Sequence, residues 1–295
     1  IHQPKPRQAV LATRLATAAV GIPVVVLVIW VGGGWLAGLV GVAVFIAVME
    51  IAIARGSVGL TWDPSRPGLL KLALAPGPDR GDPVRHALVA SLLASLLPAA
   101  ALAGEDYLLG AVVGAIIVQS TLFTFTRDPQ ADLDGWLWGV VSALYFGALA
   151  AHFILLREAP NGRDLVFFTV LTVWITDTGA YFVGRAIGRH KLSPSVSPGK
   201  TWEGSFGSWV TGFATVFGLN EAFELGLDVE HLVALGLLLP LVIMMGDLAE
   251  SAVKRGLGIK DSSGLVPGHG GIADRLDSLL FAAPVVYWYL RWIVT

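Results

Sequence analysis

The sequence predicts an all-α integral membrane protein with about nine transmembrane helices and a cytoplasmic N-terminus. Of its 295 residues, 55% are hydrophobic and only 14% are charged, whereas soluble domains average about 25% charged residues. A soluble domain of this composition has too few polar residues to cover its surface, and a lipid bilayer removes that need. The composition therefore favours a chain that lies mostly within a membrane.

Apolar stretches of nearly transmembrane length, about 20 residues, follow one another along the whole chain. The first lacks a convincing small-residue cleavage site, so we expect a retained span rather than a signal peptide. Gly32, Gly33 and Gly34 predict the turn after it. In chain order, the predicted spans are Leu15–Val31, Trp35–Ala54, Ala87–Ala103, Tyr107–Thr126, Trp136–Leu156, Leu165–Gly188, Trp202–Leu225, His231–Glu250 and Ile272–Val294.

The basic residues are divided unevenly between the two predicted sides of the membrane. Only Arg157, Arg163 and Arg291 lie opposite the N-terminus, and every other Lys and Arg lies on the N-terminal side. Because basic loops face the cytoplasm, the N-terminus and the polar loops after even-numbered spans are expected there. We expect a multi-pass protein of the inner (plasma) membrane. The chain divides into residues 1–156, which hold the N-terminal transmembrane helices, and residues 157–295, which hold the C-terminal transmembrane region.

Several classes of function receive no support from the composition. The net charge of −2 does not suggest a nucleic-acid partner, and the absence of Cys excludes disulfides, iron–sulfur clusters and thiolate zinc sites. No internal repeat is visible, which counts against a transporter built from inverted repeats. In the Pro- and Gly-rich loop 55–86, a solvated connector is favoured over a short interfacial helix at Leu69–Ala75.

Polar residues repeat one helical spacing at two predicted helix ends. Positions i, i+3 and i+4 share one face of a helix. Such residues end the eighth span and begin the ninth: Asp247, Glu250 and Ser251, then Asp274, Asp277 and Ser278. The connecting loop can bring both faces together beside Lys254, Arg255 and Arg275. Carboxylates suit Mg²⁺ that also binds substrate phosphates, and basic side chains hold phosphate.

The alternative is that these groups are ordinary solvated charges at helix ends. That alternative suits Glu203 or Glu250 taken alone. It suits Asp247, Asp274 and Asp277 together less well, because several carboxylates near the hydrocarbon boundary are costly unless something neutralises them.

Asp177 and His269 are single residues with a possible role. Asp177 lies inside the sixth predicted span, where an ionisable residue is a functional candidate, although it can also bond to a neighbouring helix. His269 stands between two Gly residues in a loop flexible enough to wrap a ligand, and the alternative is a surface His.

The segment Ser197–Thr201 (SPGKT) invites comparison with a phosphate-binding P-loop. We reject a Walker A motif because Pro194 stands where Gly is needed and no strand is predicted before it. The backbone around Gly199 can still approach a phosphate closely, with Lys200 supplying positive charge.

The segment from Ser251 to Asp277 closely resembles the signature of CDP-diacylglycerol synthases (phosphatidate cytidylyltransferases). It includes Val-Lys-Arg, Lys-Asp-x-Ser and His-Gly-Gly-Ile-x-Asp-Arg-Leu-Asp, and Val266 is a conservative departure from the Ile, Leu or Phe expected there. Asp177–Tyr181 (DTGAY) and Ser197–Gly204 (SPGKTWEG) are similar to further segments of the family. The resemblance extends from about Trp174 to Ser278.

The resemblance implies that CTP and phosphatidic acid react to give CDP-diacylglycerol and pyrophosphate in phospholipid biosynthesis. It also implies a homodimer, and Mg²⁺ bound by Asp247 and Asp274, with a second cation as an option. On this basis residues 1–156 are expected to provide support, a lipid cavity and a candidate dimer contact, and residues 157–295 a catalytic region with a cytoplasmic-face active site. Catalytic roles are expected for Asp247, Asp274, Asp277 and Lys254. Substrate contacts are expected from Asp177, Ser197, Lys200, Thr201, Glu203, Ser251, Arg255, Lys260, His269, Gly270 and Arg275.

Two other functions fit the residues less well. A CDP-alcohol phosphatidyltransferase carries an Asp-Gly-x₂-Ala-Arg-x₈-Gly-x₃-Asp-x₃-Asp pattern, which this sequence lacks. An ion-coupled transporter would use Asp177, Asp247 and Asp274 as coupling carboxylates, but the polar residues gather at one predicted membrane face. Substrate uptake into sealed vesicles without chemical turnover would favour the transporter.

Overall fold

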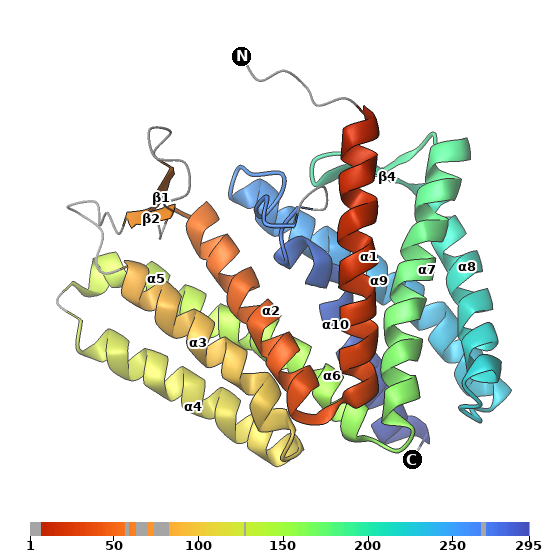
Figure 1. The fold of residues 1–295 in the computed structure, drawn as a ribbon, viewed down its shortest axis with the longest axis horizontal. Coiled ribbons are helices and arrows are strands. Elements are labelled where there is room, and N and C mark those ends of the chain that lie inside the picture. The colour runs from red at the N-terminus through yellow and green to blue at the C-terminus, as the bar shows by residue number, and fades with distance from the viewer. Residues whose placement is uncertain are drawn as a thin grey trace. The chain divides into compact units, whose positions relative to one another are not determined.

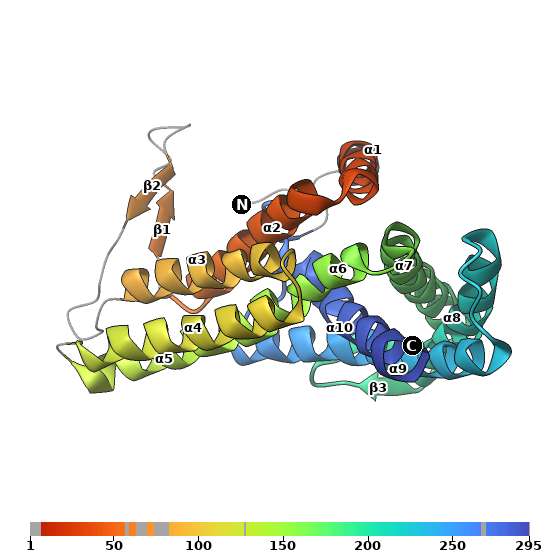
Figure 2. The same ribbon diagram turned by 90° about the horizontal axis from the view of Figure 1, so that it is seen from below.

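The computed structural model describes residues 7–56, 59–62, 70–73, 83–126, 128–266 and 270–294. α-Helices make up most of this part of the chain (Figures 1 and 2). The chain divides into two compact units, each built from three segments. Unit 1 consists of Ile1–Val24, Ala37–Ala151 and Asp261–Asp274, and unit 2 consists of Val25–Leu36, His152–Lys260 and Arg275–Thr295.

The helices occur where the hydrophobic stretches predict them. The first half of the chain contains α1 (Arg7–Val31), α2 (Gly33–Ala54), α3 (Pro83–Ala101), α4 (Glu105–Thr124) and α5 (Pro129–Ser142), which continues through a π-helix, η1 (Ala143–Ala148), into α6 (Leu149–Glu158). The second half contains α7 (Gly162–Ile187), α8 (Trp202–Ala222), α9 (Val229–Gly256) and α10 (Ala273–Tyr289), which ends in a π-helix, η2 (Leu290–Val294).

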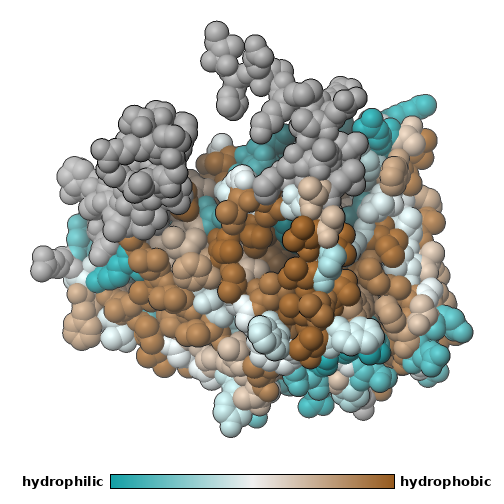
Figure 3. All heavy atoms as spheres, in the orientation of Figure 1, coloured by the Kyte–Doolittle hydropathy of each residue, from teal (hydrophilic) through white to brown (hydrophobic). Residues whose placement is uncertain are grey.

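Six helices of the described residues are long and apolar enough to cross a membrane. They are Gly33–Ala54, Val84–Ala101, Glu105–Thr124, Asp132–Glu158, Gly162–Ile187 and Val229–Gly256. Ala16–Val31 is a shorter apolar helix. Large hydrophobic side chains are exposed along α1 and α4, and Figure 3 shows hydrophobic residues over much of one face. The chain is therefore a multi-pass membrane protein, while the count of nine spans and the side of the N-terminus stay predictions.

Small residues bring the helices of unit 1 close together. A Cβ atom at Gly41 of α2 would lie 2.7 Å from the carbonyl oxygen of Ser95 on α3. A Cβ atom at Gly147 of η1 would lie 2.7 Å from the carbonyl oxygen of Ala94. Helices in membranes commonly pack through such small residues, because lipid supplies no hydrophobic force between them.

The same packing joins α7, α8 and α9 in unit 2. Gly179 of α7 has no space for a Cβ atom because Thr211 of α8 fills it, and a Cβ atom at Gly207 would lie 2.5 Å from Val183. A Cβ atom at Gly212 of α8 would lie 2.6 Å from the ring of Pro240 on α9. These close approaches fix the three helices that surround the candidate site.

The turn after α1 is the predicted glycine turn. Gly32 and Gly33 have φ values of 71° and 53°, a region that favours glycine. Arg157 donates from Nε to the carbonyl oxygen of Ile29 at 3.0 Å and from Nη2 to that of Trp30 at 3.1 Å. Because the last carbonyls of a helix lack internal partners, this guanidinium caps the end of α1.

Two short strands stand in the Pro- and Gly-rich loop of unit 1. β1 (Gly59–Trp62) pairs antiparallel with β2 (Leu70–Ala73), so that Thr61 lies opposite Lys71. The interfacial helix considered for Leu69–Ala75 is therefore wrong at residues 70–73, where cross-strand hydrogen bonds satisfy the backbone instead.

Candidate functional site

A cavity of about 470 Å³ lies among α7, α8, α9 and strand β4 (Ser197–Thr201) of unit 2. Small residues of α7 and α8, such as Gly184 and Gly204, leave room for it. Its polar lining includes Asp177, Ser197, Lys200, Thr201 and Asp247. Five residues predicted to form the site thus line one cavity.

A β-hairpin carries Lys200 to the cavity. Strand β3 (Lys191–Ser193) pairs antiparallel with β4, with Lys191 opposite Thr201 and Ser193 opposite Ser197. The expectation that no strand precedes the SPGKT segment is therefore wrong. A Walker A motif is still rejected, because Pro194 occupies the position where that motif needs Gly. The preceding strand, β3, forms a hairpin with β4.

Glu203 closes the base of this hairpin. Its carboxylate accepts hydrogen bonds from the backbone N–H of Arg189 at 3.1 Å and of His190 at 3.2 Å, and lies 2.6 Å from Nδ1 of His190. The first turn of α8, where Glu203 lies, is outside the six candidate spans. Hydrogen bonds from its own backbone N–H and from His190 lower the pKa of Glu203 to about 2. Glu203 therefore holds the hairpin as an anion.

Thr201 begins α8 at the edge of the cavity. Its side-chain oxygen accepts a hydrogen bond from the backbone N–H of Gly204 at 3.1 Å, which is the usual role of an N-cap Thr. The residue is buried, and Gly184 of α7 faces it closely. Thr201 thus has a structural role in addition to lining the cavity.

Lys200 and Asp247 form an ion pair across the cavity. Lys200 Nζ lies 2.6 Å from Oδ2 of Asp247, and Ser251 donates to Oδ1 of Asp247 at 3.3 Å. The second contact confirms that Asp247 and Ser251 share a face of α9. Both members of the ion pair are partly exposed, at 22% and 31%, so the pair remains accessible to a ligand.

Two further carboxylates, Asp177 and Asp277, lie near this ion pair. Asp177 and Asp247 line the cavity, and both interact electrostatically with Asp277 of α10. The helices meet at Gly246, where a Cβ atom would lie 3.0 Å from the carbonyl oxygen of Asp277. Like charges this close repel one another, and Lys200, Lys254 and Arg275 reduce the repulsion.

Lys254 and Arg255, two other basic residues of the prediction, have intramolecular partners. Lys254 Nζ lies 2.6 Å from the buried carboxylate of Glu250. Arg255 donates to the carbonyl oxygens of Val196 at 3.2 Å and Ile259 at 2.8 Å, which ties the hairpin loop to the end of α9. Lys260 is exposed.

Asp274 lies in unit 1 and is held by backbone groups. Its Oδ2 accepts from the N–H of Ser262 at 3.1 Å and from that of Gly271 at 2.8 Å. Gly270 has a φ of 85°, which favours glycine at this turn. His269 lies outside the described residues. Because Asp247 and Asp274 belong to different units, their shared Mg²⁺ site stays a prediction.

Glu50 of α2 is a buried ionisable residue that was not among the predicted site residues. Its carboxylate is buried, at 5% exposure, and accepts four hydrogen bonds from the loop between α9 and α10. An ionisable residue inside an apolar span is itself a signal of function. Glu50 carries the same signal as Asp177, an ionisable residue in an apolar span, but it lies outside the segment Trp174–Ser278 that resembles the family.

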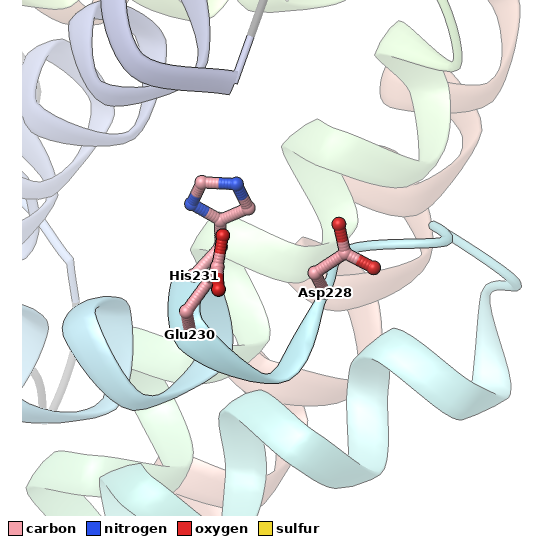
Figure 4. A group of neighbouring side chains, drawn as sticks. All are labelled: Asp228, Glu230 and His231. Carbon is pink, nitrogen blue, oxygen red and sulfur yellow. The ribbon is translucent and has the colours of Figure 1, made fainter.

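A second group of possible metal ligands lies at the start of α9 (Figure 4). Ligand atoms of Asp228, Glu230 and His231 lie within 4.8 Å of one another. Both carboxylates are exposed, and His231 Nδ1 lies 3.1 Å from the hydroxyl of Tyr289. Because a helix N-terminus stabilises acidic side chains without a cation, we assign no metal to this group.

Comparisons with known proteins agree with the resemblance. A family model described as the cytidylyltransferase family matches residues 12–293. A phosphatidate cytidylyltransferase of Bacillus subtilis is 41% identical over 170 residues, which are 57% of this chain and 60% of that protein. One of Brucella suis is 44% identical over 160 residues, covering 51% of this chain and 56% of that protein. One of Pseudomonas aeruginosa is 36% identical over 212 residues, covering 70% and 77%.

Proposed function

This chain belongs to the cytidylyltransferase family, and on that basis we propose that it is a phosphatidate cytidylyltransferase. In the proposed reaction, CTP and phosphatidic acid give CDP-diacylglycerol and pyrophosphate. The observation that carries the proposal is that Asp177, Asp247 and Lys200 line the cavity of unit 2, while Asp277 interacts electrostatically with both of these carboxylates and with Lys254 and Arg275. Such a mixture of charges suits the binding of phosphate groups together with a cation.

The proposed chemistry is a displacement at the α-phosphorus of CTP. An oxygen of the lipid phosphate forms the new bond to this phosphorus, and the bond to the oxygen that bridges to the β-phosphorus breaks. The lipid phosphate is already ionised near neutral pH, so no strong general base is required. The main obstacle is repulsion between two anions, which positioned cations reduce.

The basic side chains have the proposed task of holding phosphates. Lys200 is best placed, because its ammonium group already pairs with a carboxylate at the cavity. Lys254 and Arg275 add positive charge near Asp277. Arg255 holds the hairpin and retains further N–H donors for a phosphate.

The donor set fits Mg²⁺, which prefers carboxylate oxygens and substrate phosphates. Asp247 and Asp274 are the proposed ligands, and Asp277 and Ser251 would complete or orient them. The electrostatic repulsion between Asp247 and Asp277 indicates an environment that a cation would stabilise. When bound, Mg²⁺ would neutralise charge on the triphosphate and on the leaving pyrophosphate.

The proposed location is the inner (plasma) membrane, with the site facing the cytoplasm and the protein acting as a homodimer. Most basic residues lie in loops predicted to be cytoplasmic, which supports this orientation. A site at that boundary would receive phosphatidic acid from the bilayer and CTP from the cytosol.

The test is pyrophosphate release by the purified protein in detergent with phosphatidic acid and Mg²⁺. We expect release with CTP, much less with ATP, GTP or UTP, and none after addition of EDTA. Release that does not require phosphatidic acid, or no release from folded protein across several detergents, would contradict the proposed function. Uptake into sealed vesicles without turnover would then support the transporter.

A further inference from the structure

Both ends of the loop between α9 and α10 meet the carboxylate of Glu50. On the side of the loop nearer to α9, Ser262 donates to Oε2 at 3.0 Å and Ser263 donates to Oε1 at 2.6 Å. At its end, the backbone N–H groups of Ile272 and Ala273 donate to Oε1 at 3.0 Å and to Oε2 at 2.9 Å. One side chain of the second helix thus closes a loop that lies more than two hundred residues later in the sequence.

The packing around Glu50 requires glycine at position 271. A Cβ atom at Gly271 would overlap both Ser262 Oγ and the Glu50 carboxylate. The two backbone donors belong to the beginning of α10, where N–H groups lack partners inside the helix and the helix dipole favours negative charge. A buried carboxylate is costly without such partners, and four donors offset that cost.

We propose that Glu50 is a positioning residue, which fixes the two sides of this loop, residues 262–263 and 272–273, in the arrangement required to bind the nucleotide. The inference rests on the proposed function, because this loop belongs to the segment that resembles the cytidylyltransferase signature. Within the loop, Asp274 makes the complementary bonds to Ser262 and Gly271. Glu50 and Asp274 therefore order the loop jointly, and Glu50 acts without touching substrate.

Glu50→Gln is the decisive variant because both carboxylate oxygens accept a backbone N–H, and a Gln amide has only one acceptor oxygen. Each oxygen receives one Ser hydroxyl and one backbone N–H. A Gln amide places an NH₂ group at one of these positions, and a backbone N–H cannot accept from it. At least one N–H at the start of α10 then loses its partner, whichever way the amide is turned.

The first measurement is amide hydrogen exchange of the full-length protein in detergent. In Glu50→Gln we expect exchange at Ile272 and Ala273 to become at least about tenfold faster, while peptides of α7 and α8 keep their wild-type rates. Asp106→Asn is the matched control, because it removes an exposed carboxylate of the same unit at the start of α4. Unchanged exchange at Ile272 and Ala273 in folded Glu50→Gln would show that Glu50 does not hold the start of α10.

The second measurement separates positioning from general stability. We expect Glu50→Gln to raise KM for CTP by about tenfold or more and to change KM for phosphatidic acid by less than about twofold. Ser262→Ala removes one hydrogen bond to Glu50 and should show a smaller shift of the same kind. Equal KM values for CTP in wild type and Glu50→Gln would overturn the positioning role. An inactive wild-type protein would instead contradict the proposed function. The hydrogen-exchange result would still test whether Glu50 holds the loop.

Discussion

The two Asp residues proposed to bind one metal ion are held in different ways in the two units. In unit 2, Asp247 is paired with side chains, Lys200 and Ser251. In unit 1, Asp274 is bonded to backbone N–H groups of Ser262 and Gly271. A partly exposed Lys can move to a phosphate when substrate arrives, whereas backbone donors move only with their loop. We infer that Asp247 has exchangeable partners and that Asp274 has a fixed position.

The largest effect is expected for Asp274→Asn, which should lose both activity and stability. An Asn oxygen in place of Oδ2 can still accept from both N–H groups, but the negative charge that strengthens these bonds is lost and an NH₂ group replaces Oδ1, 3.3 Å from the backbone N of Ser262. This change should cost about 1–3 kcal/mol of unfolding free energy. Loss of a metal ligand should lower kcat/KM by about 1,000-fold. Thermal unfolding in detergent and pyrophosphate release measure the two effects. Retention of most activity at ordinary Mg²⁺ concentration would show that the metal assignment is wrong.

Asp247→Asn should lower kcat/KM by a similar factor of about 1,000 but leave stability within about 1 kcal/mol. The reason is that its ion pair with Lys200 is partly exposed, and such pairs contribute little to folding. Asp164→Asn at the start of α7, which pairs with Arg163, is a suitable control. A drop in stability as large as that of Asp274→Asn would remove the distinction between the two residues.

Lys200→Met should reduce kcat/KM by about 10- to 100-fold, because one charge-assisted contact to phosphate is lost. The methionine retains much of the apolar stem, so folding should be preserved. Initial rates at several CTP concentrations would measure the change. Full activity in this variant would contradict the role of Lys200, whereas the carboxylate assignments would not be affected.

Thr201→Ala should have the smallest effect, a loss of about 1 kcal/mol in unfolding free energy from removal of an N-cap. Activity should fall only slightly, because the hydroxyl positions the hairpin against α8 and does not contact substrate in this proposal. Denaturant or thermal unfolding beside a pyrophosphate assay would separate the two. A large loss of activity with unchanged stability would instead indicate direct substrate contact by the hydroxyl.

The positions of the helices could be predicted from the sequence because long apolar stretches leave few alternatives. The spacing of Asp247 and Ser251 likewise predicted a shared face, since helix geometry is local. The hairpin before Thr201 was missed because its strands are short and polar. Glu50 was visible as an ionisable residue in an apolar span, but its partners lie far along the chain, so its role depends on the tertiary fold.

The tight fit between α7 and α8 has a practical consequence for anyone engineering a more robust version of this protein. Replacing a helical glycine by alanine ordinarily gains up to about 1 kcal/mol of helix stability. At Gly218 of α8 a methyl group would meet open space, so the usual gain is available there. At Gly179 the same methyl group would collide with Thr211, so the substitution should damage the protein. A library that treats all helical glycines alike would mix improved and ruined variants.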